Sequence, residues 1–536
     1  MRGRAGRPAG FLPWLVLLLM LAVPAPMVRA EAPDGPELRI GLDSLGVTYA
    51  PYAVNSLSTR TLLSHLYEGL VARRPDLGLV PSLATGWSRR PDGAWLFELR
   101  PGVLFHRGGV LRAGDVVYSL CRILATPGSV LATTVRQFAM VEAVGADKVA
   151  IHPLAPFADV PGQMVGLWIV QAPSGWAGRF DPAGCAGVEG TPGPVPDGPP
   201  DANGTGPYRL VQYQADTHLV MVRFPGHWHG VPAWGRVVML RIGDAGRRAR
   251  ALVVGEVDLI DMVPAESLAY LQGRPNLEIV AGPIYRVFMI QMNQRSAAMD
   301  VQGRNPLADA RVRRAISLAI DRGTLARRTM VNGAKPTSQL VPTGMAGHQP
   351  DLSDDPYDPD AARRLMREAG FTDGFTLSLA TLDHAARLGT AVARYLQQIG
   401  IRVILHTLSE AELISRAAAG DFQLFIGSAN LFSGDFTTLV RDLLASPDEA
   451  AGRGGYNRGQ FRDAEMDALV ARLMTLPPDD PLLPAYRRRV ALLAHAQTAV
   501  VPLAHAGRLW AVRHGLAFSG RMDGMTLAMD VAPPPP

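Results

Sequence analysis

The stretch Leu388–Leu405, LGTAVARYLQQIGIRVIL, joins a helix directly to a strand. Its apolar residues recur at helical spacing as far as Ile399, a pattern that predicts a helix with one buried side. Gly400 then ends the helix, and the branched residues of Ile401–Leu405 predict a buried strand. A helix, a glycine and a strand in immediate succession indicate α/β architecture.

Other elements on both sides of this stretch have clear boundary signals. An apolar stripe from Val312 to Ile320 predicts a second amphipathic helix. Asp358 and Pro359 precede a third helical pattern and Gly370 follows it, in the N-cap, N1 and C′ positions that these residues prefer. The first half of the chain predicts strands at 37–42, 95–99, 219–224 and 237–242, helices at 61–67 and from 113 onward, and a loop at 43–58.

The length and composition fit a large globular protein. A chain of 536 residues predicts more than one packed unit, and 48% hydrophobic with 19% charged residues excludes both wholesale disorder and a polytopic membrane protein. Four arginines and no acidic residue lie within 1–30, so the formal charge of +5 falls to nearly neutral beyond this segment. A near-neutral chain is not a nucleic-acid-binding protein.

The N-terminus is typical of a signal peptide. Arginines precede the apolar run Phe11–Val23, and Val28-Arg29-Ala30 offers the small residues that a signal peptidase requires. The run would make about 20 Å of helix, too short for a hydrocarbon core of roughly 30 Å. Since no cysteine lies near the cleavage site, we expect residues 1–30 to be removed and the product to be free in the periplasm, without a lipid anchor.

Two further features remain open at this stage. Cys121 and Cys185 are the only cysteines, and in an oxidising compartment they either form a disulfide or remain separate core residues. Residues 186–206 contain a run rich in proline and glycine, which sustains neither a helix nor a central strand and predicts a surface loop.

No catalytic signature is present in the sequence. It lacks a Gly-x-Ser-x-Gly elbow, a His-Glu-x-x-His motif, a P-loop, a Cys-x-x-Cys pair and a complete dinucleotide fingerprint. His227-Trp228-His229 would place two imidazoles on one side of a strand, but transition metals generally require three or four donors. We therefore favour two exposed histidines beside a packed Trp228, and we predict no enzyme activity, no metal site and no cofactor.

Short blocks that follow one another across some 400 residues resemble a known family. They include Leu66-Tyr67-Glu68-Gly69-Leu70, Pro81-Ser82-Leu83-Ala84, Gly204-Thr205-Gly206-Pro207-Tyr208, Ala319-Ile320-Asp321-Arg322 and Ile399-Gly400-Ile401. In this order they resemble the extracytoplasmic solute-binding proteins of ABC importers, specifically family 5, the binders of dipeptides, oligopeptides and nickel.

This resemblance implies the α/β two-lobed periplasmic binding protein fold (type II), with an extra domain inserted in the first lobe. By spacing, lobe I would comprise residues 31–62, 205–285 and 505–536, the extra domain 63–204, and lobe II 286–504. The segments Tyr285–Asn293 and Val500–Val512 would cross between the lobes.

The resemblance also implies a set of ligand-binding residues. Peptide-binding relatives hold the ligand backbone with an extended segment, which matches Tyr52–Leu57 here and points to Asn55 and Leu57. They hold the α-amino group with an aspartate, and the corresponding segment Ile426–Asp435 contains Phe432 and Asp435. Asp435 is either the amine anchor or a cap for the following helix. The resemblance also points to an arginine that holds the ligand carboxylate, in the loop that contains Asp383, His384 and Arg387, but for Arg387 we favour a solvated first-turn residue.

The resulting hypothesis is a monomeric binding component that delivers a peptide or small polar solute to an ABC permease and ATPase complex. The site departs from the peptide-binding pattern, because Ser428 stands where tryptophan is usual. The alternative ligands are therefore a nickel chelate, an opine or an amine metabolite. A chemosensory protein that presents its ligand to a receptor is a further alternative, as is a hydrolase or chaperone that reuses the fold.

Overall fold

A computed structural model describes residues 35–534 apart from the gaps at 47, 53–55, 128, 155–158, 189–201, 264, 296–300, 302, 331–332, 431–433, 449–451 and 478–479. The predicted signal peptide and most of the predicted loop at 186–206 lie outside the described residues. Within those residues, no helix is long and apolar enough to cross a bilayer.

An 11-stranded mixed sheet runs through the whole molecule. In spatial order its main path is β15 (Ile401–Leu408), β14 (Phe375–Leu382), β16 (Leu424–Asn430), β12 (Leu277–Met292), β17 (Val500–Arg513), β11 (Leu259–Ile260), β1 (Glu37–Leu42), β10 (Arg236–Arg241), β9 (His218–Arg223) and β8 (Tyr208–Gln214). The short strand β13 (Lys335–Pro336) pairs with β17 beside this path.

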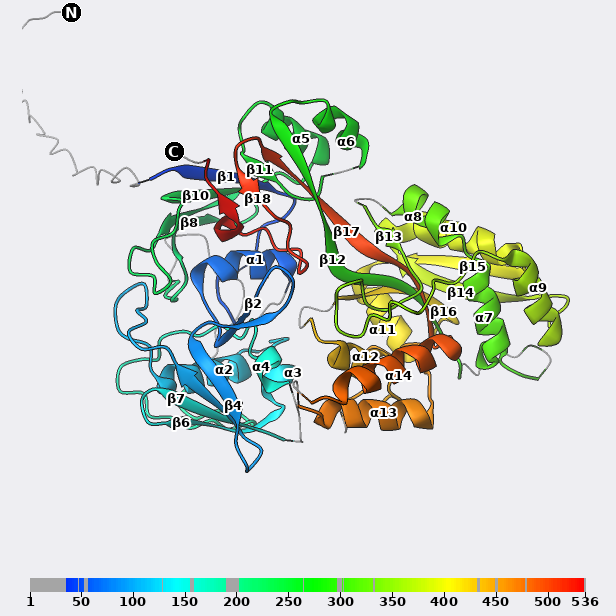
Figure 1. The fold of residues 1–536 in the computed structure, drawn as a ribbon, viewed down its shortest axis with the longest axis horizontal. Coiled ribbons are helices and arrows are strands. Elements are labelled where there is room, and N and C mark those ends of the chain that lie inside the picture. Colours follow the sequence, from blue (N-terminus) through cyan, green and yellow to red (C-terminus); the bar gives the residue numbers. More distant parts are fainter. Residues whose placement is uncertain are drawn as a thin grey trace, which may run out of the picture.

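Two bodies flank the long strands β12 and β17, which pair antiparallel and cross between them (Figure 1). We call the body that contains β1 the first lobe and the body that contains β14 the second lobe. In the second lobe β12 also pairs with β16, while β17 pairs with β11 in the first lobe. The predicted crossings Tyr285–Asn293 and Val500–Val512 thus fall almost wholly within β12 and β17.

The first lobe has a lower part with its own sheet. This sheet has the order β4 (Ala84–Arg89), β5 (Trp95–Leu99), β7 (Lys148–Pro153) and β6 (Phe138–Val144), and it packs against α2 (Ala113–Ala125). The hairpin of β2 (Val71–Arg73) and β3 (Leu79–Pro81) is separate. The other helices of this lobe are α1 (Leu57–Leu66), α3 (Ala132–Val135), α4 (Val160–Gln163), α5 (Ala245–Val253) and α6 (Ala265–Gln272). A short pair, β18 (Ala517–Phe518) and β19 (Val531–Ala532), lies near the C-terminus.

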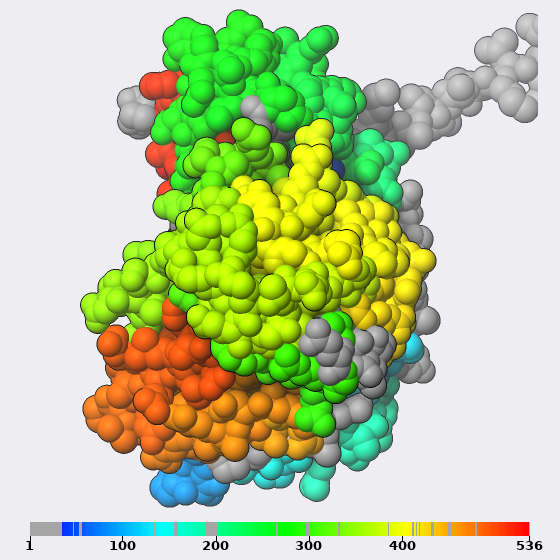
Figure 2. Space-filling model, turned by 90° about the vertical axis from the view of Figure 1, so that its right-hand side faces the viewer, coloured from blue at the N-terminus to red at the C-terminus, as the bar shows by residue number. Residues whose placement is uncertain are grey.

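The second lobe is richer in helix. Its helices are α7 (Ala310–Leu318), α8 (Arg322–Thr329), α9 (Pro359–Glu368), α10 (Ala386–Gln397), α11 (Glu410–Ala419), α12 (Phe436–Leu443), α13 (Ala464–Thr475) and α14 (Leu483–Ala496). Figure 2 shows the outer face of this lobe, where the yellow-green segments lie above the orange helices near the C-terminal end of the chain. Single 3₁₀ turns occur at Pro306–Ala308, Asp383–Ala385 and Ala528–Asp530.

Each part of the molecule has a separate hydrophobic core. Buried residues between Leu70 and Cys185 form the core of the lower part. Other clusters cover the sheet of the first lobe around Ile40 and that of the second lobe around Ile316. A further second-lobe cluster, around α12 to α14, includes Leu77 from the first lobe.

Most of the predicted elements are confirmed, and one helix start is wrong. α9 begins after Asp358, whose carboxylate accepts a hydrogen bond from the N–H of Ala361 at 2.7 Å, and Gly370 follows its end at φ +85°. α1 begins at Leu57 rather than Thr61, because the Ser56 side chain accepts from the N–H of Thr59 and caps the helix one turn earlier.

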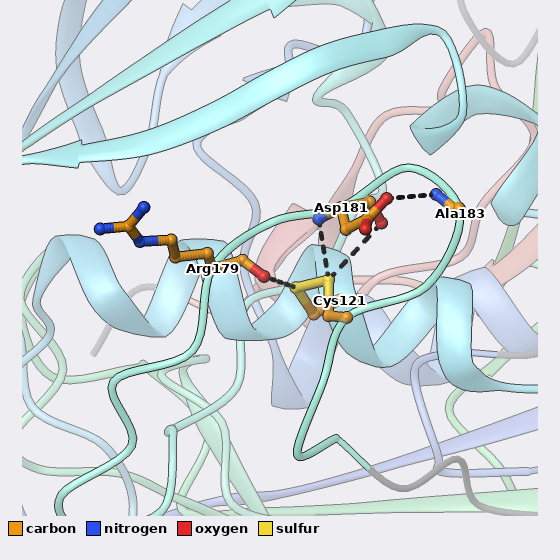
Figure 3. Close-up of a disulfide and its surroundings, with 5 residues drawn as sticks. Cys121, Arg179, Asp181 and Ala183 are labelled. Carbon is orange, nitrogen blue, oxygen red and sulfur yellow. Dashed lines mark hydrogen bonds between the residues drawn. A yellow bond between two sulfur atoms is a disulfide. The ribbon is translucent and has the colours of Figure 1, made fainter.

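Cys121 and Cys185 form a disulfide that attaches an irregular segment to α2 (Figure 3). The N–H of Asp181 donates to Sγ of Cys185 at 3.4 Å, and the carboxylate of Asp181 accepts from the N–H of Ala183 at 2.8 Å. This resolves the alternative that the sequence leaves open in favour of a disulfide.

Candidate functional site

The two lobes touch where the β2–β3 hairpin meets the N-terminus of α12. Leu77, at the turn of the hairpin, is 4% exposed and packs in the same cluster as Tyr285 and Phe436. Gly434 lies so close that a Cβ atom on it would be 3.0 Å from Nη1 of Arg73 and 3.1 Å from Cβ of Leu77. The hairpin of the first lobe therefore reaches into the second.

The hairpin is held in this position by hydrogen bonds to residues 521 and 522, and residue 522 is in turn bonded to the crossing strand β12. The N–H of Met522 donates to the carbonyl of Pro75 at 2.9 Å, and the N–H of Tyr285 in β12 donates to the carbonyl of Met522 at 2.7 Å. Arg521 donates from Nη2 to the carbonyl of Arg73 at 3.0 Å. Movement of β12 is thus coupled to the position of the hairpin.

Ionisable side chains from both lobes gather at this contact. They interact electrostatically with one another, and we call them the interlobe cluster: Arg73 at the end of β2, Asp159 before α4, Tyr285 in β12, Asp435 before α12 and Arg487 in α14. Figure 1 shows why the fold brings them together, since α4 lies on the side of the first lobe that faces α12.

Asp435 is the N-cap of α12. Its carboxylate accepts hydrogen bonds from the N–H of Thr437 at 3.1 Å, the N–H of Thr438 at 2.8 Å and the Thr438 hydroxyl at 3.0 Å. The capping role that the sequence allows is therefore confirmed. A role as the anchor for a ligand's amino group is compatible with this cap, because each carboxylate oxygen accepts more than one hydrogen bond.

Asp159 caps α4 with only one of its oxygens. Oδ1 accepts from the N–H of Gly162 at 3.0 Å, whereas Oδ2 is buried and has no hydrogen-bond partner among the described residues. Burial, followed by the negative charge of Asp435, raises the pKa of Asp159 to about 8, although Arg73 and Arg487 oppose the shift. A carboxyl group in this state is neutral at pH 7.

Tyr285 is a second buried group with an unused polar atom. Its side chain is 5% exposed, and within the described part of the chain its hydroxyl has no hydrogen-bond partner. Burial and then the charge of Asp435 raise the pKa of Tyr285, so the hydroxyl keeps its proton. Buried polar groups normally have partners, and an exception at a contact between lobes suggests a place for a bound molecule.

The site residues predicted from the sequence are only partly brought to this contact. Asp435 belongs to the interlobe cluster, while Asn55 and Phe432 lie outside the described residues. Leu57 is half-buried at the start of α1.

The three residues predicted around a ligand carboxylate lie elsewhere in the second lobe. Asp383 and His384 form the 3₁₀ turn after β14, and Arg387 is in the first turn of α10. Asp383 and Arg387 are exposed, and no hydrogen bond or ion pair in the described structure links either of them to the interlobe cluster.

A groove of about 540 Å³ lies beside the interlobe cluster, and Arg73 lines it. Its walls come from α1, the β2–β3 hairpin, the segment 227–234 and the segment 521–531, all in the first lobe. The groove has the size of a small-molecule site, but by itself it is not a site formed by both lobes.

The His227-Trp228-His229 segment forms part of this wall and is not a strand, which corrects one expectation. Glu68 accepts hydrogen bonds from His227 Nε2 at 3.2 Å, from Trp228 Nε1 at 3.0 Å and from the Thr205 hydroxyl at 2.8 Å. His227 is thus nearly buried, and only His229 is exposed as predicted. No group of three or more metal-ligating side chains occurs among the described residues.

Comparison with known proteins gives consistent similarities. The family model for bacterial extracellular solute-binding proteins, family 5, matches residues 78–450. The chain is 26% identical to "Di/tripeptide-binding protein 2" of Pseudomonas aeruginosa, over 93% of this chain and 94% of that protein. It is 28% identical to the glutathione-binding protein GsiB of Salmonella typhi, over 87% and 88% of the two chains.

Two solved structures have the same fold at lower identity. DppA of Helicobacter pylori, in complex with a peptide, has a TM-score of 0.72 and 18% identity over 94% of this chain and 98% of its own. HbpA2 of Haemophilus parasuis has a TM-score of 0.78 and 19% identity over 92% and 99%. The fold is therefore that of the two-lobed periplasmic binding proteins.

Proposed function

Because this chain belongs to family 5 of the bacterial extracellular solute-binding proteins, we propose that it captures a peptide or peptide-like solute between its lobes for an ABC importer. Members of this family are non-catalytic, solute-binding components of transport systems. Relatives named for dipeptides, tripeptides and glutathione support a peptide as the ligand. The observation that carries the proposal is the interlobe cluster, in which buried polar groups from both lobes face one another.

In this proposal Asp435 binds the α-amino group of the peptide while it continues to cap α12. A carboxylate that already accepts two backbone N–H groups is held in a fixed orientation in which it can also accept from an ammonium group. Asn55, Leu57 and Phe432 are proposed to line the ligand near this point, and Asp383, His384 and Arg387 to contact its far end.

The mechanism is a shift of population between open and closed lobes. A ligand that contacts both lobes binds only the closed form, so its differential affinity moves the equilibrium toward closure. About 5.5 kcal/mol of differential binding changes a 1:99 ratio into 99:1. The crossing strands β12 and β17 are the elements about which closure occurs. The domain boundaries at 62/63, 204/205, 285/286 and 504/505 form part of the same proposal.

The family supports a proposal for the cellular context. We place the mature protein in the periplasm as a monomer, after removal of residues 1–30, with the permease and ATPase of an importer as its partners. Closed lobes present a surface that the permease distinguishes from the open form.

Thermal unfolding with a panel of solutes tests this function. The panel contains di- to pentapeptides, glutathione, amines, an opine and a nickel chelate. A ligand at 100 times its Kd adds about 2.7 kcal/mol to the free energy of unfolding. We expect peptides to raise the melting temperature, and a panel in which only non-peptides do so would contradict the peptide assignment.

Asp435→Asn supplies the site-specific control, because asparagine also caps helices. Asp463→Asn makes the same change at the N-cap of α13, and Asp463 is not a member of the interlobe cluster. We expect Asp435→Asn to weaken peptide affinity tenfold or more, by loss of a charge-assisted hydrogen bond, and Asp463→Asn to leave it unchanged. Equal affinities in the two variants would rule out Asp435 as the anchor.

A further inference from the structure

Asp159 has features that capping α4 does not explain. A helix of only four residues gains little from a charged cap, yet Oδ2 of this carboxylate is buried and has no hydrogen-bond partner among the described residues. An unsatisfied buried acceptor costs stability unless another molecule completes it.

The charged groups around Asp159 act on it in opposite directions. Arg73 from β2 and Arg487 from α14 attract it, while Asp435 from α12 repels it. Neither arginine is hydrogen-bonded to Asp159, and Nη1 of Arg73 instead donates to the carbonyl of Leu77 at 2.6 Å. Tyr285 from β12 adds a buried hydroxyl oxygen that also has no hydrogen-bond partner in the described part of the chain.

Two carboxylates from opposite lobes thus face the same small region. When the lobes are closed without a ligand, the negative charge of Asp435 disfavours a second carboxylate beside it, and Asp159 keeps its proton. A cation between the two groups would favour the ionised form of both, and a primary ammonium group supplies three N–H donors for Asp159, Asp435 and the Tyr285 hydroxyl.

We propose that Asp159 and Asp435 together form an ammonium subsite across the lobes, which makes Asp159 a specificity-determining residue for ligands with a free primary amine. This inference rests on the proposed function and extends it. It assigns Asp159 as a second ligand-binding carboxylate and a primary amine as the chemical group that this carboxylate selects.

Binding of an amine at this subsite changes the protonation state of Asp159. In the ligand-free closed form the Asp159 carboxyl is protonated at pH 7, because its pKa is about 8. An ammonium ion beside it favours the carboxylate, so the O–H bond of Asp159 breaks and the proton passes to the solvent. Binding of an amine at pH 7 therefore releases close to one proton.

The test compares tri-alanine with N-acetyl-tri-alanine by calorimetry at pH 7, in phosphate and in Tris, two buffers of different ionisation enthalpy. The variants are wild type, Asp159→Asn and Asp244→Asn, which changes the N-cap of α5 far from the cluster. In wild type we expect the free amine to bind tenfold or more tightly than the acetylated peptide, with proton release. Asp159→Asn should reduce the preference about tenfold and abolish the release, whereas Asp244→Asn should change neither.

The outcomes separate this inference from the peptide assignment. If Asp159→Asn keeps both the preference and the proton release, the inference is wrong while the peptide assignment stands. If tri-alanine does not bind, putrescine and L-alaninamide replace it. Their binding with proton release that Asp159→Asn removes would support the ammonium subsite without a peptide ligand. Failure of every amine to bind with proton release would overturn the subsite.

Discussion

At the scale of single residues, His65 shows how burial fixes a protonation state. Its side chain is fully buried, Nε2 accepts from the N–H of Ala528 at 2.9 Å, and Nδ1 therefore carries the proton donated to the carbonyl of Thr61 at 2.7 Å. A second proton, on Nε2, would have neither a hydrogen-bond acceptor nor contact with solvent. Burial accordingly lowers the pKa of His65 to about 4.

This lowered pKa predicts a pH-dependent contribution to stability. Below the unfolded value of 6.5 the unfolded chain binds a proton that native His65 refuses, so stability falls as the pH drops toward about 4. The slope is at most about 1.4 kcal/mol per pH unit for one group. Asp159 acts in the opposite direction, because its raised pKa makes the native state the stronger proton binder between pH 4 and 8.

Substitution of His65 by asparagine isolates the contribution of the imidazole to the pH dependence of stability. The asparagine amide keeps a hydrogen-bond donor at the Nδ position. We expect wild type to have the higher free energy of unfolding at pH 7. Denaturant titrations should show this difference decreasing by about 2 kcal/mol from pH 7 to pH 5. An advantage that is the same at both pH values would contradict the lowered pKa.

At the scale of elements, the boundary signals show what could be predicted from the sequence. α9 and the strand after α10 follow from Asp358, Pro359, Gly370 and Gly400, whose effects are local. The start of α1 was missed because its first turn has no apolar stripe, and Ser56 was the available signal. The family blocks were informative for a similar reason, since Glu68 joins two of them through its hydrogen bond from Thr205.

The interlobe cluster could not be predicted in the same way. Arg73, Asp159, Tyr285 and Arg487 come from four separate elements, and each is unremarkable in its local sequence. Only the pairing of β12 with β17 and the packing of the hairpin bring them together. Asp435 was found because a family pattern places an acid there, not because of any local property.

The disulfide between α2 and the segment near Asp181 gives an element-scale prediction. It closes a loop with a sequence separation of 64, for which the chain-entropy estimate is about 4 kcal/mol. We expect the double variant Cys121→Ala/Cys185→Ala to lose about 2–4 kcal/mol of unfolding free energy in guanidinium titrations. Alanine suits the site because Cys121 is fully buried. Reduction of wild type should cause a similar loss, and wild type and the double variant should then unfold alike under reducing conditions.

At the scale of the whole molecule, the position of Leu77 links closure to affinity. It belongs to the first lobe by sequence but packs with Tyr285 and Phe436 in a second-lobe core. Under the proposed mechanism this contact forms only in the closed form, so its energy stabilises that form. Leu63, by contrast, is fully buried within a core of the first lobe alone.

The two leucines therefore predict different phenotypes when each is replaced by alanine. Leu63→Ala should lower the free energy of unfolding by about 2–5 kcal/mol and leave the affinity for tri-alanine nearly unchanged. Leu77→Ala should weaken that affinity tenfold or more and increase the radius of gyration of the ligand-bound protein in X-ray scattering, with little loss of stability in the ligand-free protein. If Leu77→Ala instead destabilises the ligand-free protein as much as Leu63→Ala does, the hairpin is a permanent part of the second-lobe core. The lobes would then not open at this contact, and closure about β12 and β17 would have to be abandoned.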